Sequence, residues 1–312
     1  MFGLRYHVAS LAAVFVALAV GILLGVAVSG KLTDVTDDAE LQNLRDDNER
    51  LEQQLDALQA DADAARSRSE GSDELFASAY PALMEGRLDG KNVAVVFLGP
   101  ADGSVRAEIE GTLADADADG DAPARVVALD VPVDPAGVTA ILEGDELLAG
   151  YADEGGDLSD LGRELGRQLA EGDDTLWGSL QSELIEEQSG STSTPIDAAV
   201  VVTTWTAPEN ADPDEEADPA AEATASLLDG LVSGLHSLDL PVVGLAAGDN
   251  PEQALDAYRD RGISTVDDIG LSAGRLALAL LLAGAEPGHY GFGESATDGS
   301  VPPIEPLPVE GE

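Results

Sequence analysis

The first long apolar run of the chain extends from Val8 to Val28 and is interrupted only by Ser10. As a helix with a rise of 1.5 Å per residue, it is about 31 Å long and matches a hydrocarbon core of about 30 Å. This run predicts a membrane-spanning anchor. Ala27 and Ser29 also provide a signal-peptidase pattern, so a cleaved leader is the alternative, although the run exceeds the usual length of a signal h-region.

The charges on either side of this run give only a weak orientation signal. Arg5 and His7 precede it, and Lys31 follows it. Positive residues favour the cytoplasmic side of a membrane. We expect a single-pass protein of the cell membrane with its N-terminus in the cytoplasm and the remaining residues outside.

The next segment, residues 32–70, has the heptad pattern of a coiled coil. Asn48 occupies an a position, where a buried Asn favours a parallel, two-stranded register. The pattern therefore predicts a parallel homodimer, and an amphipathic helix lying on its own globular domain is the alternative. The predicted seam consists of Leu41, Leu44, Asn48, Leu51, Leu55, Leu58, Ala62 and Ala65.

Beyond residue 70, short apolar runs alternate with helical patterns. Such alternation is typical of an α/β domain in which helices cover both faces of a mainly parallel sheet, and we expect a Rossmann-like fold. The predicted strands are Asn92–Leu98, Arg125–Val131, Asp197–Thr204, Val242–Ala246 and Ile263–Val266. The predicted helices are Val105–Ala116, Leu158–Leu169, Ala220–Leu238, Pro251–Arg261 and Ser272–Ala283.

These patterns divide the chain into four parts. We expect an N-terminal segment with its anchor in residues 1–31, a coiled-coil stalk in 32–70, an extracytoplasmic α/β domain in 71–301 and a proline-rich tail in 302–312. The tail contains four prolines and is expected to be extended or disordered.

The composition excludes several classes of function. The chain has 61 acidic and 15 basic residues, a formal net charge of −46, and no cysteine. Such a charge repels nucleic-acid phosphates, so we expect no nucleic-acid partner. Without thiols there are no disulfides, thiolate metal sites or cysteine nucleophiles. The acidic residues are spread along the chain, as on the surface of a halophilic protein that stays soluble in high salt.

One pattern hints at an enzyme. Residues 270–274 fit G-x-S-x-G between a predicted strand and a predicted helix, as in the nucleophile elbow of a hydrolase. The candidate catalytic histidine, His289, follows Ser272 by 17 residues, which leaves little chain for the partners that a hydrolase needs. We therefore favour Ser272 as a helix N-cap, keep a serine hydrolase as the remote alternative, and expect no enzyme. We also expect no cofactor, because no G-x-G-x-x-G or Walker loop follows a predicted strand.

The N-terminal block Leu4–Phe15, its continuation to Gly25, and three blocks near the other end resemble the actinobacterial copper transport protein B (MctB) family. The later blocks are Ser264–Ile269, Gly274-Arg275 and Gly288–Gly291. The resemblance implies a cell-envelope protein that contributes to copper homeostasis or efflux. A structural envelope scaffold is the alternative. The residues that we single out from these blocks as candidates are Asp267, Asp268, Arg275, His289 and Tyr290.

The ligand inventory for copper is small. Copper(I) prefers thiolate and thioether ligands, and the soft or imidazole ligands of the chain are His7, His236, His289, Met1 and Met84. No two of them have the spacing of a ligand pair. We therefore expect no tight copper site in a single chain, while copper association itself stays open. Asp267 and Asp268 close the last predicted strand and are the acids expected nearest a ligand crevice at the carboxyl ends of the sheet.

Overall fold

The computed structural model describes residues 13–23, 37–117, 125–144, 148–151, 157–191, 193–205, 218–247 and 251–305. The chain divides into two compact units, Met1–Ser72 and Asp73–Glu312. Each unit is described by itself.

In the first unit, residues 13–23 form a helix whose side chains are exposed. The remaining residues of the predicted span Val8–Val28, and the basic residues on both sides of it, lie outside the described residues. Among the helices that the structure describes, none combines the length and the apolar content needed to cross a membrane.

The helix α2 (Asp37–Met84) begins in the first unit and ends in the second. It contains 48 residues and continues beyond residue 70, where the predicted stalk ends. Leu51, Leu55 and Leu58 of the predicted seam are more than half exposed along it. The last turns of α2 belong to the second unit, where Tyr80 donates a hydrogen bond to Asp115 and Phe76 packs against the core.

The second unit contains a seven-stranded sheet with the order β3-β2-β1-β4-β5-β6-β7. All neighbouring strands are parallel except β2 and β3, which are antiparallel. The strands are β1 (Val93–Leu98), β2 (Arg125–Leu129), β3 (Ile185–Gly190), β4 (Ala198–Thr203), β5 (Val242–Ala246), β6 (Ser264–Val266) and β7 (His289–Tyr290).

The chain reverses its direction of travel across the sheet between β1 and β4. From β1 it proceeds to β2 on one side, and from β4 it proceeds through β5 and β6 to β7 on the other. In open α/β sheets, ligands bind at the carboxyl ends of the strands beside such a switch point. Here these ends are Leu98 of β1 and Thr203 of β4, which pair in register.

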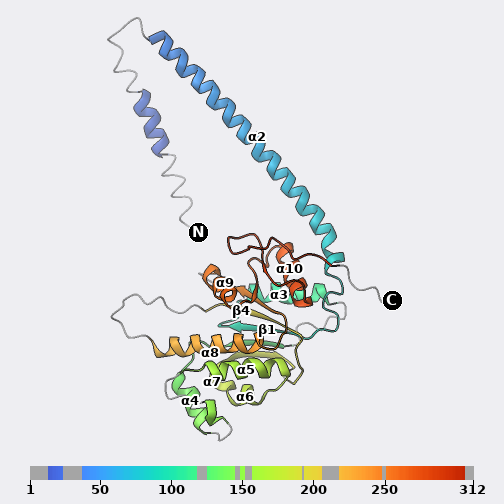
Figure 1. Cartoon of the computed structure of the whole chain (residues 1–312). Helices are drawn as coiled ribbons and strands as arrows, with labels where there is room; N and C mark the ends of the chain where they lie inside the picture. The colour runs from blue at the N-terminus through green and yellow to red at the C-terminus, as the bar shows by residue number, and fades with distance from the viewer. Residues whose placement is uncertain are drawn as a thin grey trace. The chain divides into compact units, whose positions relative to one another are not determined.

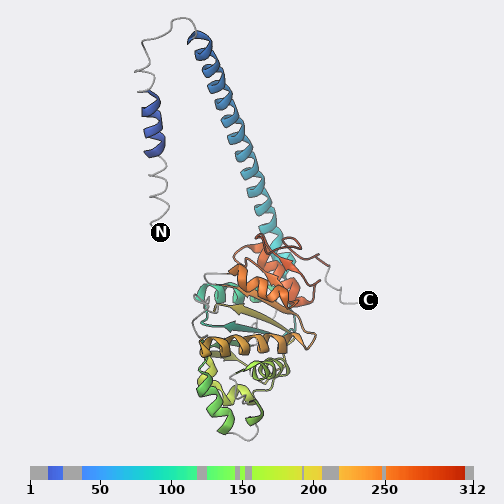
Figure 2. The ribbon, with the colours of Figure 1, turned by 60° about the vertical axis from the view of Figure 1, so that its left-hand side comes forward.

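Helices cover both faces of the sheet. The central strands are therefore buried along nearly their whole length. Figures 1 and 2 show α3 and α10 on one face, and α8 with α5 beyond it on the other. The described helices of this unit after α2 are α3 (Gly103–Ala116), α4 (Pro135–Gly144), the 3-10 turn Ala149–Tyr151, α5 (Ser159–Glu171), α6 (Thr175–Ser179), α7 (Gln181–Leu184), α8 (Pro219–His236), α9 (Pro251–Asp260) and α10 (Ser272–Ala283).

Glycines allow α5 and α8 to pack backbone against backbone. A Cβ on Gly162 would lie 2.1 Å from the carbonyl oxygen of Leu227, and one on Gly230 would lie 2.0 Å from that of Ser159. Gly166 and Gly234 repeat this arrangement one turn later. Each helix thus has two glycines four residues apart on its contact face, and small residues at this spacing permit the closest approach of two helices.

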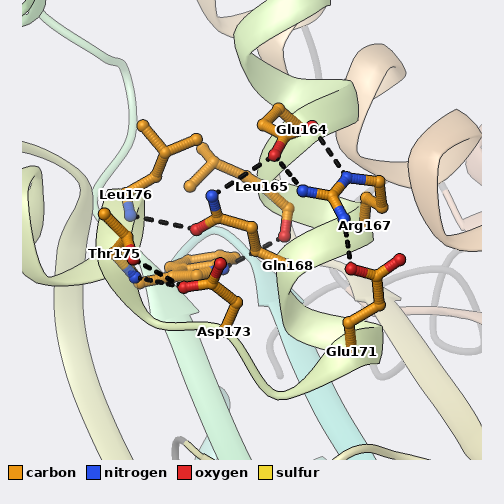
Figure 3. Close-up of polar contacts among 9 residues, drawn as sticks. Glu164, Leu165, Arg167, Gln168, Glu171, Asp173, Thr175 and Leu176 are labelled. Atoms are coloured by element: carbon orange, nitrogen blue, oxygen red, sulfur yellow. Dashed lines mark hydrogen bonds and ion pairs between the residues drawn. The ribbon is translucent and has the colours of Figure 1, made fainter. Parts of the chain in front are cut away.

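A polar network holds α6 against α5 (Figure 3). The side-chain oxygen of Gln168 accepts a hydrogen bond from the backbone N–H of Leu176 at 2.9 Å. The indole N–H of Trp177 donates to the carbonyl oxygen of Leu165 at 3.0 Å, and the guanidinium of Arg125 lies 5.3 Å from the centre of the Trp177 ring. Arg167 joins Glu164 and Glu171 along the exposed side of α5. Every buried polar group of Gln168 and Trp177 in this contact therefore has a partner.

The α/β architecture and the mainly parallel sheet are confirmed, and all five predicted strands and all five predicted helices are present within two residues of their predicted bounds. The sequence analysis missed the helices α4, α6 and α7, the 3-10 turn Ala149–Tyr151, and the strands β3 and β7. Of the predicted tail, residues 302–305 are described, and Arg87 donates a hydrogen bond to the carbonyl oxygen of Glu305 at 2.7 Å.

Candidate functional site

Four of the five candidate residues from the sequence, Asp267, Asp268, His289 and Tyr290, lie in or directly after the last two strands, and Arg275 lies in α10. Asp267 follows β6 directly, and its carboxylate accepts hydrogen bonds from the backbone N–H groups of Phe292 and Gly293. Its own backbone N–H donates to the carbonyl oxygen of Tyr290 at 3.2 Å. The Asp267 carboxylate thus holds the turn that follows β7.

Position 291 must be glycine because the Asp267 carboxylate occupies the space of a side chain there. Gly291 has a φ of +145°, and a Cβ there would lie 1.7 Å from Oδ1 of Asp267. Any side chain at this position would collide with the Asp267 carboxylate. The glycines at positions 291 and 293 of the G-H-Y-G-F-G sequence therefore leave room for the Asp267 carboxylate in this turn.

His289 is held from two sides at the start of β7. Its Nδ1 lies 3.0 Å from the hydroxyl oxygen of Thr265, and its backbone N–H donates to Asp298 at 2.8 Å. Burial lowers the pKa of the His289 imidazole, and the nearby Arg259 lowers it further, while Asp298 opposes them. The imidazole is therefore neutral at pH 7.

Tyr290 is buried, at 4 % exposure, and its hydroxyl donates to the carbonyl oxygen of Glu286 at 3.2 Å. Burial raises the pKa of this hydroxyl, and the charges of Asp298 and Glu286 raise it further. Tyr290 is thus a protonated core residue at neutral pH.

Asp268 and Arg275 close the turn between β6 and α10. Oδ1 of Asp268 accepts a hydrogen bond from the N–H of Gly270 at 2.9 Å, and Nε of Arg275 donates to the carbonyl oxygen of Ile269 at 3.0 Å. A Cβ on Gly274 would lie 1.8 Å from the carbonyl oxygen of Asp268. The two glycines of the G-x-S-x-G pattern therefore serve the turn itself.

The expected N-cap role of Ser272 is wrong. The N-cap of α10 is Leu271, which forms no side-chain cap hydrogen bond, and Ser272 is the first residue of the helix. The main chain of this turn is held by Asp268 and Arg275 instead.

Metal ligands do not gather in the part of the chain that the structure describes. No group of three or more His, Cys, Asp or Glu side chains that could hold a metal ion occurs among its residues. Met84 is fully buried in the core, and His236 is exposed at the end of α8. His7 and Met1 lie outside the described residues.

The crevice at the switch point contains none of the five candidates. A cavity of about 190 Å³ opens there, lined by Leu98 and Thr203 at the strand ends, by Trp205, and by one face each of α8 and α9. Sequence analysis missed it because its walls come from four separate elements. In the sequence, Leu228 and Val232 of α8 are four positions apart, as are Ala254 and Tyr258 of α9, and this spacing indicates only an apolar helix face.

Comparison with known proteins finds a family and relatives that match almost the whole chain. The model of the family described as copper transport outer membrane protein, MctB, matches residues 1–301. The chain is 28 % identical over 338 aligned positions to proteins named copper transporter MctB from Mycobacterium bovis and Mycobacterium tuberculosis, and the match covers 96 % of this chain and 99 % of each relative. No solved structure matches. The chain belongs to the MctB family of copper transport proteins.

Proposed function

We propose that this chain is a single-span, membrane-anchored protein of the cell envelope that contributes to copper homeostasis without a tight copper site of its own. The observation that carries the copper role is the extent of the family match. It covers residues 1–301 of this chain, and the relatives named as copper transporters match over 99 % of their length.

The anchor is proposed from the apolar run Val8–Val28, whose length suits one crossing of a bilayer. The chain beyond it carries all 61 acidic residues. In the proposed topology this acidic part lies outside the cell, so that its field concentrates cations near the membrane surface. Such attraction is weak and is screened by salt.

The stalk is proposed to form a parallel homodimer through residues 32–70. The described part of the seam supports this, because Leu51, Leu55 and Leu58 are 53 %, 64 % and 65 % exposed in the single chain. Burying a leucine side chain contributes roughly 1.5–3 kcal/mol. In the predicted register Asp61 occupies a g position and Arg66 the e position of the next heptad, so that they pair between two copies. Within one chain Arg66 forms an exposed pair with Asp63 at 2.9 Å, and because such a pair contributes little, Arg66 is able to exchange it for Asp61 of a second copy.

The absence of a tight copper site is proposed from the ligand chemistry. The chain has no cysteine and two methionines, and Met84 is buried in the core. Equilibrium dialysis of the purified full-length chain, after mild chelation, against copper(I) and copper(II) tests this. We expect no stoichiometric binding at micromolar free copper, and one tightly bound ion per chain would overturn this part of the proposal.

The anchor has its own test. Membranes from cells that express the chain are washed with alkaline carbonate, and the N-terminus of the retained protein is sequenced. We expect the chain to remain with the membrane and to keep residues 8–28. Mature molecules that begin at Gly30 and wash off the vesicles would show that the apolar run is a cleaved leader.

A structural envelope scaffold is the second candidate function, and the exposed seam of α2 is the observation that favours it. The two functions differ in what a loss of the gene changes. A scaffold predicts altered envelope integrity with normal copper content, together with crosslinking of α2 to other envelope proteins.

A further inference from the structure

The cavity at the switch point is walled by two helix faces and two strand ends. In α8, Ala225, Leu228 and Val232 recur at helical spacing along one face. In α9, Ala254 and Tyr258 do the same. The wall residues of α8 and α9 are therefore mainly apolar, and the cavity opens beside the carboxyl ends of β1 and β4.

A close contact keeps the strand side of this cavity in shape. Gly99, directly after β1, has a φ of +126°, and a Cβ there would lie 2.6 Å from the Thr204 hydroxyl and 3.1 Å from Cβ of Trp205. The backbone N–H of Trp205 donates to the carbonyl oxygen of Leu98 at 3.2 Å. The indole of Trp205 is thus carried on a backbone that is fixed next to β1.

Two hydroxyl groups in the lining of the cavity form a pair, and the amide of Gln253 is a further uncharged polar group there. The hydroxyl oxygens of Thr203 and Tyr258 are 2.6 Å apart. Burial raises the pKa of the Tyr258 hydroxyl, so both groups are protonated at neutral pH. Two hydroxyls that share one hydrogen bond use one proton between them, and the second proton is available to an acceptor on a ligand.

The guanidinium of Arg261, which lines the cavity together with Asp229, does not offer a site for an anion. Nε and Nη2 of Arg261 both donate to Asp229, and its Nη1 donates to the carbonyl oxygen of Ala257. All three nitrogens of this guanidinium are therefore engaged within the chain. The net charge of −46 further disfavours a negative ligand.

We infer that this cavity binds a small, neutral molecule that has one apolar ring or short chain and one hydrogen-bond acceptor. Its volume of about 190 Å³ lies below the roughly 300–1,000 Å³ of pockets for drug-sized ligands, so the occupant is small. The acceptor of the ligand meets the Thr203–Tyr258 hydroxyl pair, and its apolar part lies against Leu228 and Val232. The inference does not depend on the copper role.

Benzamide and benzoate test this inference, because they have nearly the same shape and differ in charge. Binding to the full-length chain is measured by saturation-transfer NMR titration. We expect benzamide to bind with a Kd on the order of 1 mM, as suits a ligand of its size, and benzoate to bind at least tenfold more weakly.

Two variants fill the cavity from different helices. Ala257→Phe adds a ring from α9, and Ala225→Phe adds one from an exposed position of α8, where folding tolerates it. Each is expected to weaken benzamide binding at least tenfold. Ala107→Phe, at an exposed position of α3, is the matched control and is expected to bind as the unsubstituted chain does. The inference is overturned if benzamide does not bind, if benzoate binds equally well, or if both filled variants retain full affinity.

Discussion

The carboxylate of Asp267 occupies the space in which a side chain at position 291 would lie, since a Cβ on Gly291 would approach its Oδ1 to 1.7 Å. Twenty-four positions separate the two residues, yet they act as one unit. The aspartate supplies the acceptor for the amides of Phe292 and Gly293, and the glycine makes room for it. This pairing gives both residues a structural role in the turn that follows β7.

Replacing Gly291 with alanine is expected to destabilise the chain by about 2–4 kcal/mol, because the new Cβ displaces the Asp267 carboxylate and the positive φ is strained. Gly90→Ala is the control, since Gly90 has a φ of +70° and open space around it. The control is expected to lose about 1–2 kcal/mol, from the backbone conformation alone. Urea unfolding measures both. Equal losses would show that the Asp267 contact is unimportant.

Replacing Asp267 with alanine removes the acceptor for the N–H groups of Phe292 and Gly293. We expect a loss of about 1.5–3 kcal/mol in the free energy of unfolding, the usual value for hydrogen bonds to a charged group. Amide hydrogen exchange of residues 292 and 293 is expected to accelerate. Unchanged exchange at these two amides would contradict the hydrogen bonds from Phe292 and Gly293 to the Asp267 carboxylate.

The close contact between α5 and α8 is tested by two glycine-to-alanine variants that are expected to change the free energy of unfolding in opposite directions. Gly162→Ala places a Cβ 2.1 Å from the carbonyl oxygen of Leu227, and we expect a loss of about 2–4 kcal/mol from overpacking. Gly111→Ala, in α3 with open space around it, is expected to gain about 0.5–1 kcal/mol from helix propensity. Thermal unfolding distinguishes the two, and a stabilised Gly162→Ala variant would rule out the close contact.

The neutral state of His289 predicts a pH dependence of stability. Its pKa in the folded chain lies below the ordinary value of 6.5, mainly because of burial and then because of Arg259. The unfolded chain therefore binds more protons near pH 6, and the contribution of His289 is fully present above pH 6.5 and is lost as the pH falls through the lowered pKa. The difference in unfolding free energy between the unsubstituted chain and His289→Gln is expected to shrink between pH 8 and pH 5. A constant difference would contradict the lowered pKa.

The sequence predicts those parts of the fold in which one pattern dominates locally. The central strands are continuous apolar runs, such as Val93–Leu98, because both of their faces are buried. The edge strand β3 has the sequence I-E-E-Q-S-G and carries no apolar alternation, so only its pairing with β2 defines it. The strand β7 has two residues and is likewise defined by its neighbour β6.

The candidate site shows the same limit. The sequence singles out the blocks around Asp267 and His289, and the structure brings these blocks together through the pairing of β6 with β7. The hold of Asp267 on the turn after β7 depends on Gly291 and on the backbone amides of residues 292 and 293. A pattern of side chains in the sequence does not reveal such contacts. The N-cap assignment of Ser272 failed for a related reason, because Asp268 and Arg275 already hold the turn in which a cap would act.

The most direct measurement of the central claim is the copper content of cells that lack the gene, together with their growth in copper. The account predicts that the deletion raises cell-associated copper and lowers copper tolerance, and that the full-length chain restores both, whereas a chain without residues 8–28 does not. Unchanged copper content and tolerance after deletion would contradict the account.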